Sequence, residues 1–379
     1  MIQFVDLKAQ YEQLKTDIDA GIRKVLQHGK FIMGPEVTEL EDTLAAYAGV
    51  KHCISVSNGT DALLIPLMAW GVGRGDAVFV PDFTFASTSE VACLTGATPV
   101  FVDIDRKTFN MDPQSLEEKI LKVKKGGLLV PRVVIPVDLF GLPAEYDKIT
   151  QIARRYGIRV LEDAAQGFGG KILEKKAGSF GDAAATSFFP SKPLGCYGDG
   201  GAIFTSDDEL AEAAESIRSH GKGKDKYDNV RIGLNARLDT LQAAILLVKL
   251  KAFAETELDA RNRCAQMYTD GLVKCITTPA VPKGYTSSWA QYSLLAETHA
   301  QRDLLQRKLA ENQIPTVVYY PRPLHRQTVN RQYLFPDEDY PVATDISERI
   351  FSIPMHPYLS TETIHKIIDT IREIIDKTV

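Results

Sequence analysis

The stretch Ala183-Ala-Ala-Thr-Ser-Phe-Phe-Pro-Ser-Lys-Pro-Leu-Gly-Cys-Tyr-Gly-Asp-Gly-Gly201 carries one lysine between a strand of small residues and a glycine-rich turn. Pro193 disfavours helical geometry at Lys192, and Pro190 restricts the chain on its approach. The glycines let a ligand or another backbone segment come close. The stretch therefore predicts a constrained loop just past a strand end, where Lys192 is either an ordinary surface lysine or a reactive amine.

Strands and helices alternate over the first two thirds of the chain. Strands are predicted at residues 52–57, 76–80, 99–103, 132–137, 158–163, 183–188 and 202–205. Alternation of this kind predicts an α/β fold with a mostly parallel sheet and helices on both faces. Ligands bind such sheets beyond the carboxyl ends of the strands. The candidate site residues described below all fall at such ends.

Helices flank the alternating region on both sides. Two are predicted before it, at 8–28 and from Pro35 to about Ala48. A long helix predicted at 238–268 leads into a smaller α+β part. Its elements are expected as strands near 290–295 and 316–320 and helices near 302–311 and 361–376. We therefore expect a large domain over residues 1–250 and a small C-terminal domain over 251–379.

Composition limits the classes of function. The 379 residues carry a net charge of -5, which gives no electrostatic reason to expect a nucleic acid or an anionic membrane as partner. Neither a signal peptide nor a membrane-spanning apolar run is recognisable. The five cysteines have no metal-ligand spacing, so we expect no metal site and a reducing, cytoplasmic compartment.

The segment Ser57-Asn-Gly-Thr-Asp61 lies at a strand-to-helix turn. Exposed backbone N–H groups at a helix start bind phosphate well, and the helix dipole favours the negative charge. The same residues are also consistent with a simple helix cap. The segment alone leaves both interpretations open.

Four further residues complete a possible site. Asp163 ends a buried strand, where it either caps the next segment or pairs with a protonated heterocyclic nitrogen, with Gln166 as a donor to a ring oxygen. Phe85 either packs in the core or stacks on a flat ring. Lys192 becomes a nucleophile if burial lowers its pKa. A phosphate cradle, a pyridinium partner, a stacking ring and a reactive lysine are together what a protein contributes to pyridoxal-phosphate chemistry.

Five motifs resemble the pyridoxal-phosphate-dependent nucleotide-sugar aminotransferases of the DegT/StrS family. They are Asn58-Gly-Thr-Asp-Ala62, Phe83-Thr-Phe85, Glu162-Asp-Ala-Ala-Gln166, Ser187-Phe-Phe-Pro-Ser-Lys192 and Asn235-Ala-Arg-Leu-Asp239. The resemblance extends from Phe4 to Tyr358. It implies the fold type I architecture, with a mostly parallel seven-stranded sheet and a smaller α+β C-terminal domain. It also implies a homodimer whose two subunits build each active site.

The resemblance assigns a role to each motif residue. It makes Lys192 the residue that forms the Schiff base with pyridoxal 5'-phosphate and moves the proton, and Asp163 the partner of the pyridine nitrogen. Gln166 then contacts the phenolic oxygen and Phe85 stacks on the ring. Gly59, Thr60 and Ser187 hold the phosphate, and Asn235 of the partner subunit joins them there.

Within the family the chain is most similar to enzymes that aminate UDP-2-acetamido-2-deoxy-3-keto-glucuronic acid for surface polysaccharide (O-antigen) biosynthesis, with L-glutamate as the expected donor. Arg237 of the partner subunit then meets the sugar carboxylate, or else forms an ion pair at the dimer interface. Tyr320 and His325 belong to a stretch that resembles the substrate loop, in which His325 either contacts the sugar or closes the loop. Tyr319 departs from the histidine that relatives often have before the tyrosine.

Three alternatives remain open. A related aminotransferase could act on a dTDP- or UDP-linked 3- or 4-keto-6-deoxy sugar. A dehydratase on the same scaffold replaces the lysine with histidine, which Lys192 argues against. A non-catalytic regulator could retain the fold, and the intact lysine, aspartate and phosphate cradle argue against it.

Overall fold

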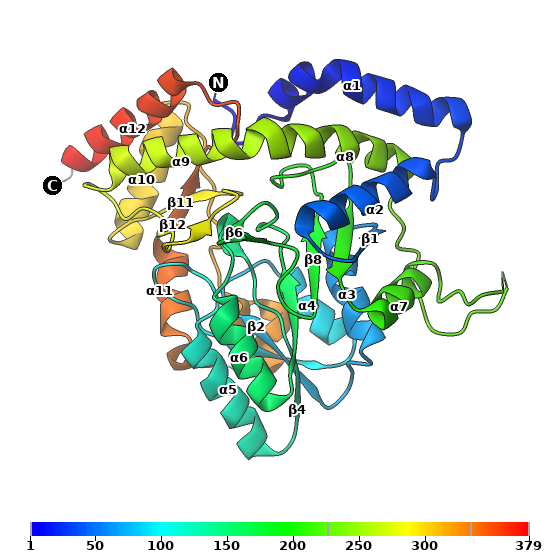
Figure 1. The fold of residues 1–379 in the computed structure, drawn as a ribbon. Helices are drawn as coiled ribbons and strands as arrows, with labels where there is room; N and C mark the ends of the chain where they lie inside the picture. Colours follow the sequence, from blue (N-terminus) through cyan, green and yellow to red (C-terminus); the bar gives the residue numbers. More distant parts are fainter. Residues whose placement is uncertain (1, 226, 334–335, 378–379) are drawn as a thin grey trace.

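A seven-stranded sheet forms the centre of the protein (Figure 1). The computed structural model describes residues 2–225, 227–333 and 336–377. The strands lie in the order β1-β9-β8-β5-β4-β2-β3. Their bounds are β1 His52–Val56, β2 Asp76–Pro81, β3 Thr98–Val102, β4 Val130–Val134, β5 Arg159–Asp163, β8 Ala183–Ser187 and β9 Gly201–Thr205. Strand β9 is antiparallel to β1 and β8, and the other pairings are parallel, which confirms the predicted mostly parallel sheet.

Helices cover both faces of this sheet. They are α3 Gly59–Ala69, α4 Ser87–Leu94, α5 Pro113–Gly126, α6 Tyr146–Tyr156 and α7 Asp208–Arg218. Successive side chains of β2 point to opposite faces, as strand geometry requires. Ala77 and Phe79 belong to the core formed with α5 and α6, whereas Val78 and Val80 belong to the core formed with α3 and α7. The central strands are therefore buried on both sides.

Local caps explain where the helices begin and end. At the start of α5 the side chain of Asp112 accepts a hydrogen bond of 2.8 Å from the backbone N–H of Ser115, and Pro113 occupies the first turn. At its end Gly127 adopts a left-handed conformation with φ 68°. Gly29 and Gly49 end the first two helices, α1 Leu7–His28 and α2 Pro35–Ala48, in the same way.

The predicted long helix is formed by three consecutive segments. Helix α8 (Thr240–Ala252) continues through a π-helical turn (Phe253–Glu257) into α9 (Leu258–Leu272). The remaining helices are α10 His299–Glu311, α11 Pro341–Arg349 and α12 Thr361–Asp376. We propose that the boundary between the large and small domains lies near residue 250, just before the π-helical turn.

The small sheet corrects one prediction. Strand β11 (Tyr292–Leu295) pairs with β12 (Ile350–Ile353), which the sequence did not reveal. The strand predicted at 316–320 is wrong, because there only Val317 forms an isolated bridge, to Ser352. The chain then leaves the sheet and carries Tyr320 to Gln166 instead.

Short elements complete the chain. They are the strands β6 Lys171–Ile172, β7 Lys175–Lys176 and β10 Tyr285–Thr286, and the 3-10 helices η1 Leu139–Gly141, η3 Leu324–Arg326, η4 Thr328–Tyr333 and η5 Asp337–Asp339. Helix α1 lies along the top of the molecule beside α8 (Figure 1). Ahead of α1, Ile2 packs against the core of the small domain, and Met355 donates its backbone N–H to the carbonyl oxygen of Phe4 (3.3 Å).

Candidate active site

Lys192 lies in the connection between β8 and β9, whose ends are held together by the pairing of Ser187 with Gly201. Inside the connection Cys196 donates its backbone N–H to the carbonyl oxygen of Phe188 (2.8 Å), so the loop folds back on itself. Burial lowers the pKa of the Lys192 amine, and the negative charge of Asp163 opposes this shift. The constrained loop predicted from the two prolines and the glycines is what the structure contains.

Asp163 ends β5 on the neighbouring strand and is buried, with 5% of its surface exposed. One carboxylate oxygen accepts a hydrogen bond from the Thr88 hydroxyl (2.9 Å), and the other accepts one from the backbone N–H of Ala165 (3.2 Å). Burial raises the pKa of Asp163, while these hydrogen bonds and the charge of Lys192 counteract the rise. The acid and the amine therefore influence each other directly.

The start of α3 meets the end of β8. Asn58 caps the helix by accepting a hydrogen bond of 2.8 Å from the backbone N–H of Asp61. A Cβ atom on Gly59 would lie only 2.6 Å from Cβ of Ser187, so this close approach requires glycine. The Thr60 and Ser87 hydroxyls lie 2.8 Å apart. Hydroxyls and a helix start thus converge as a phosphate cradle would require.

Gln166 is buried and has a defined orientation. Its Oε1 accepts a hydrogen bond from the backbone N–H of Phe140 (2.7 Å), and its Nε2 donates to the Tyr320 hydroxyl (3.0 Å). Burial raises the pKa of Tyr320, so this phenol keeps its proton. Phe85 is 57% exposed, with its ring centroid 6.4 Å from that of Tyr320. Phe85 is therefore no core residue, and its exposed surface is free to cover a flat ring.

His325 is held by two carboxylates. Its Nδ1 lies 2.6 Å from Oδ2 of Asp82 and its Nε2 lies 2.8 Å from Oδ1 of Asp337. The backbone N–H of His325 also donates to Asp82 (2.8 Å). Both ring nitrogens are therefore engaged in closing the loop that carries Tyr320. A contact between His325 and a sugar would require one of these ion pairs to break.

Asn235 and Arg237 lie on the surface next to the cradle. Arg237 donates to Oδ1 of Asn235 (2.5 Å), and the carbonyl oxygen of Ala236 between them accepts from the backbone N–H of Ser57 (3.0 Å). Asn235 is exposed and has no role in the core. The pair is accessible to a second molecule.

Two residues near this site were not foreseen. Thr88 and Ser87 form the first turn of α4, and their hydroxyls reach Asp163 and Thr60 respectively. The available signal was the pair of hydroxyl side chains that follows Phe85 and Ala86 at a helix start. Their partners are distant in sequence, so the pattern did not identify them.

Two classes of site can be assessed from the described part of the chain. Within it, no group of three or more His, Cys, Asp or Glu side chains could hold a metal ion. None of its helices is both long and apolar enough to cross a membrane.

Comparisons with known proteins agree with this geometry. A model of the DegT/DnrJ/EryC1/StrS aminotransferase family matches residues 12–372. The UDP-2-acetamido-2-deoxy-3-oxo-D-glucuronate aminotransferase of Pseudomonas aeruginosa is 49% identical over 96% of this chain and 98% of its own. A pleiotropic regulatory protein of Geobacillus stearothermophilus is 41% identical over 98% of both chains.

Solved structures are similar over the full chain. The crystal structure of a DegT DnrJ EryC1 StrS aminotransferase from Brucella abortus superposes with a TM-score of 0.96, at 50% identity, covering 99% of this chain and 100% of the other. The PLP-form of the sugar aminotransferase Spr1654 from Streptococcus pneumoniae gives a TM-score of 0.88 at 26% identity, covering 96% and 97%. The predicted fold and the predicted cofactor, pyridoxal phosphate, are confirmed by these likenesses.

Proposed function

Because the chain belongs to the DegT/DnrJ/EryC1/StrS aminotransferase family, we propose that it transfers an amino group from L-glutamate to UDP-2-acetamido-2-deoxy-3-keto-glucuronic acid. The observation that carries the proposal is the half-buried Lys192, whose charge acts on the buried Asp163, beside a cradle in which Gly59 leaves no room for a side chain. The substrate is taken from the relative at 49% identity. We further propose that the product serves surface polysaccharide (O-antigen) biosynthesis.

The residues present fit pyridoxal phosphate. Gly59, Thr60 and Ser187 would hold its phosphate, Asp163 its ring nitrogen and Gln166 its phenolic oxygen. A cradle that a Cβ atom would fill, and a buried carboxylate whose charge acts on a half-buried amine, support this assignment. When bound, pyridoxal phosphate supplies a carbonyl that carries the amino group and a ring that accepts electrons.

Lys192 takes and returns the proton that moves during transamination. Burial lowers the pKa of its amine, so the neutral, basic form is more accessible than for an exposed lysine. Asp163 stays close to that amine and offers a negative charge where the ring nitrogen needs one. We propose that Phe85 of the large domain, together with Tyr320 and the loop closed by His325 of the small domain, covers the site and limits the access of water.

We propose that the active site is shared between two subunits of a homodimer. Phe31, Ile32 and Met33 are exposed, and Thr240 donates its backbone N–H to the carbonyl oxygen of Phe31 (2.9 Å). These apolar residues therefore lie beside the segment that carries Asn235 and Arg237. Contiguous exposed apolar surface of this kind marks interaction sites.

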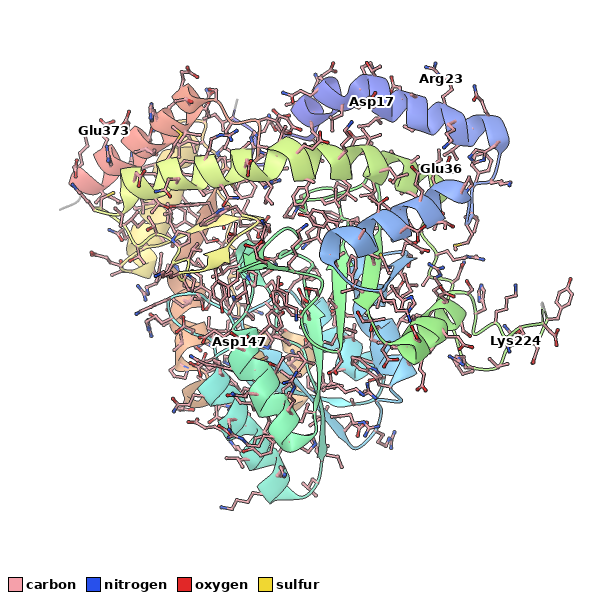
Figure 2. The ribbon with its side chains drawn as sticks, in the orientation of Figure 1. Asp17, Arg23, Glu36, Asp147, Lys224 and Glu373 are labelled. Carbon is pink, nitrogen blue, oxygen red and sulfur yellow. The ribbon has the colours of Figure 1, made fainter. Side chains whose placement is uncertain are left out.

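The segment after α7 offers a second contact surface. It projects away from the body of the molecule, with Lys224 near its outer end (Figure 2). Val230 and Ile232 on its return are 55% and 84% exposed. In the proposed dimer this arm packs on the partner subunit, and Asn235 and Arg237 reach the partner's cradle. We also propose the cytoplasm as the compartment, because none of the five cysteines, all of which lie in the described part of the chain, forms a disulfide.

Absorption spectroscopy tests the proposed role of Lys192. The purified protein with pyridoxal phosphate should show a visible band that fades when L-glutamate is added. Lys192→Ala should lose both the band and turnover, because it removes the amine that is proposed to bind the cofactor covalently and to move the proton. A wild-type protein without any band would favour the non-catalytic regulator, whereas a fully active Lys192→Ala variant would refute the proposed role of Lys192.

The sugar is tested by initial rates. A UDP-linked 3-keto uronic acid is compared with its 6-deoxy counterpart, with wild-type protein and Arg237→Ala. Losing the guanidinium should raise KM for the uronic acid by about tenfold or more and leave KM for the neutral sugar almost unchanged. Equal effects on both sugars would assign Arg237 to the dimer interface and favour a 6-deoxy sugar as substrate.

A further inference from the structure

The first turn of α4 connects the separate parts of the proposed cofactor site. Ser87 is 2.8 Å from the Thr60 hydroxyl of the cradle, and Thr88 donates to Asp163 across 2.9 Å. Ser87, Thr88 and Asp163 are 9%, 1% and 5% exposed. These contacts bring α4 and β5 together although 75 residues separate Thr88 from Asp163. One helical turn therefore faces both the phosphate end and the ring-nitrogen end of the site.

We propose that Thr88 is a positioning residue that acts through Asp163, fixing the orientation of the carboxylate and keeping it ionised for the pyridine nitrogen. The proposal rests on the proposed function. It goes beyond that function because neither the sequence motifs nor the comparisons give Thr88 a role.

The direction of the hydrogen bond follows from the chemistry of its partners. A carboxylate only accepts, so the single hydroxyl proton of Thr88 points at Asp163. The Thr84 hydroxyl lies 3.4 Å from that of Thr88 and is available to donate to it in turn. A hydroxyl whose oxygen receives a hydrogen bond becomes a better donor. The chain Thr84–Thr88–Asp163 is thus aligned to favour the ionised acid.

The second hydrogen bond to the Asp163 carboxylate is longer than the one from Thr88, so Thr88 is the residue that orients this carboxylate. The backbone N–H of Ala165 binds the other oxygen at 3.2 Å, the longer of the two hydrogen bonds. Without the Thr88 hydroxyl, Oδ2 of Asp163 would be buried with no hydroxyl donor. Protonation of Asp163 or rotation of its carboxylate would then compete with the ionised, correctly oriented state. Either change weakens the interaction of Asp163 with a protonated pyridine nitrogen.

The test uses the affinity of the apoprotein for pyridoxal phosphate, measured by fluorescence titration. Thr88→Val keeps the shape of the side chain and removes the hydroxyl, and should raise Kd by about tenfold or more. Thr88→Ser keeps the hydroxyl and should stay within about threefold of wild type. Thr84→Val, which removes only the outer donor, should have an effect between those two.

A double-mutant cycle separates positioning from a general structural role. Asp163→Asn removes the charge through which Thr88 is proposed to act. In the Asp163→Asn background, Thr88→Val should change Kd by less than about twofold. An unchanged Kd in Thr88→Val, or the same loss in both backgrounds, would overturn the proposal. Failure of Asp163→Asn alone to weaken binding would instead overturn the proposed role of Asp163 as the partner of the ring nitrogen.

Folding is monitored separately by urea denaturation of each apoprotein. If Thr88→Val does not fold, the cycle is run with Thr88→Ala, which removes the hydroxyl without adding atoms. A Kd change that Thr88→Ser restores and that vanishes with Asp163→Asn supports positioning, whatever the stability of the variants.

Discussion

Replacing His325 by alanine should lower the free energy of unfolding by about 3–5 kcal/mol, the usual cost of breaking a buried ion pair from one side. The variant leaves the Asp82 carboxylate, which is 0% exposed, without its contact to the imidazole ring. The backbone N–H of residue 325 remains as a donor to Asp82, so the acid keeps one hydrogen bond. The expected loss is mainly the cost of an uncompensated buried charge.

The second ion pair of His325 provides the matched control. Asp337 contacts the same ring, but its side chain is 52% exposed. Asp337→Asn should therefore cost only about 0–1 kcal/mol, as exposed pairs do. The assay is urea denaturation followed by tryptophan fluorescence, on both variants and wild type. Equal losses for the two variants would refute the reasoning that burial of Asp82 decides the cost.

The loss should also depend on pH. Burial lowers the pKa of His325, but its hydrogen bonds to Asp82 and Asp337 outweigh that effect, so the pKa is raised above its ordinary value. The contribution of the charged ring is then complete below about pH 6.5 and is lost as the pH rises through the raised pKa. The difference between wild type and His325→Ala should therefore shrink as the pH rises above about 6.5. A difference that grows over this range would contradict an imidazolium.

Three other variants test separate features. Gly59→Ala should weaken the affinity of the apoprotein for pyridoxal phosphate about tenfold or more, because its Cβ would lie 2.6 Å from that of Ser187; a titration with unchanged Kd would contradict the cradle. Phe188→Ala removes a side chain that is 0% exposed and should cost about 3–5 kcal/mol in urea denaturation, where a loss below about 1 kcal/mol would be inconsistent with the packing. Lys249→Met should raise the free energy of unfolding by about 2–3 kcal/mol at neutral pH, because burial lowers the pKa of the amine to about 8 from 10.5. This gain should vanish as the pH rises from about 8 to about 10.5, since the folded protein then binds fewer protons than the unfolded chain; a gain independent of pH would refute the titration of Lys249.

The central sheet and its site were predictable because their signals are local. The strands of the central sheet contain short runs of apolar or small residues, and Lys192 and Asp163 became candidates through the rule that ligands bind at the carboxyl ends of parallel strands. Gly59 was recognisable as part of a strand-to-helix turn, although the helix starts at Gly59 itself rather than near Ala62 as expected. The resemblance to a family then gave the same residues their roles.

The features that escaped prediction depend on contacts between distant segments. Ile350–Ile353 is a short apolar run that fits a strand or a helix equally well, and its pairing with Tyr292–Leu295 only appears in three dimensions. His325 could be assigned to the substrate or to the loop until Asp82, 243 residues earlier, became visible as its partner. Thr88 is similar, because a hydroxyl at a helix start most often serves as a cap.

The contact between the two ends of the chain has a consequence for biosynthesis. Ile2 and Phe4 find their partners in the small domain, which includes Met355, near the other end of the polypeptide. Synthesis proceeds from the amino terminus, so the first residues leave the ribosome long before the surface that receives them exists. The contacts of Ile2 and Phe4 can therefore form only after the segment that includes Met355 has been synthesised. An affinity tag fused ahead of Ile2 should slow the docking of Ile2 and Phe4 or leave it incomplete. A tag after α12 should not affect this docking.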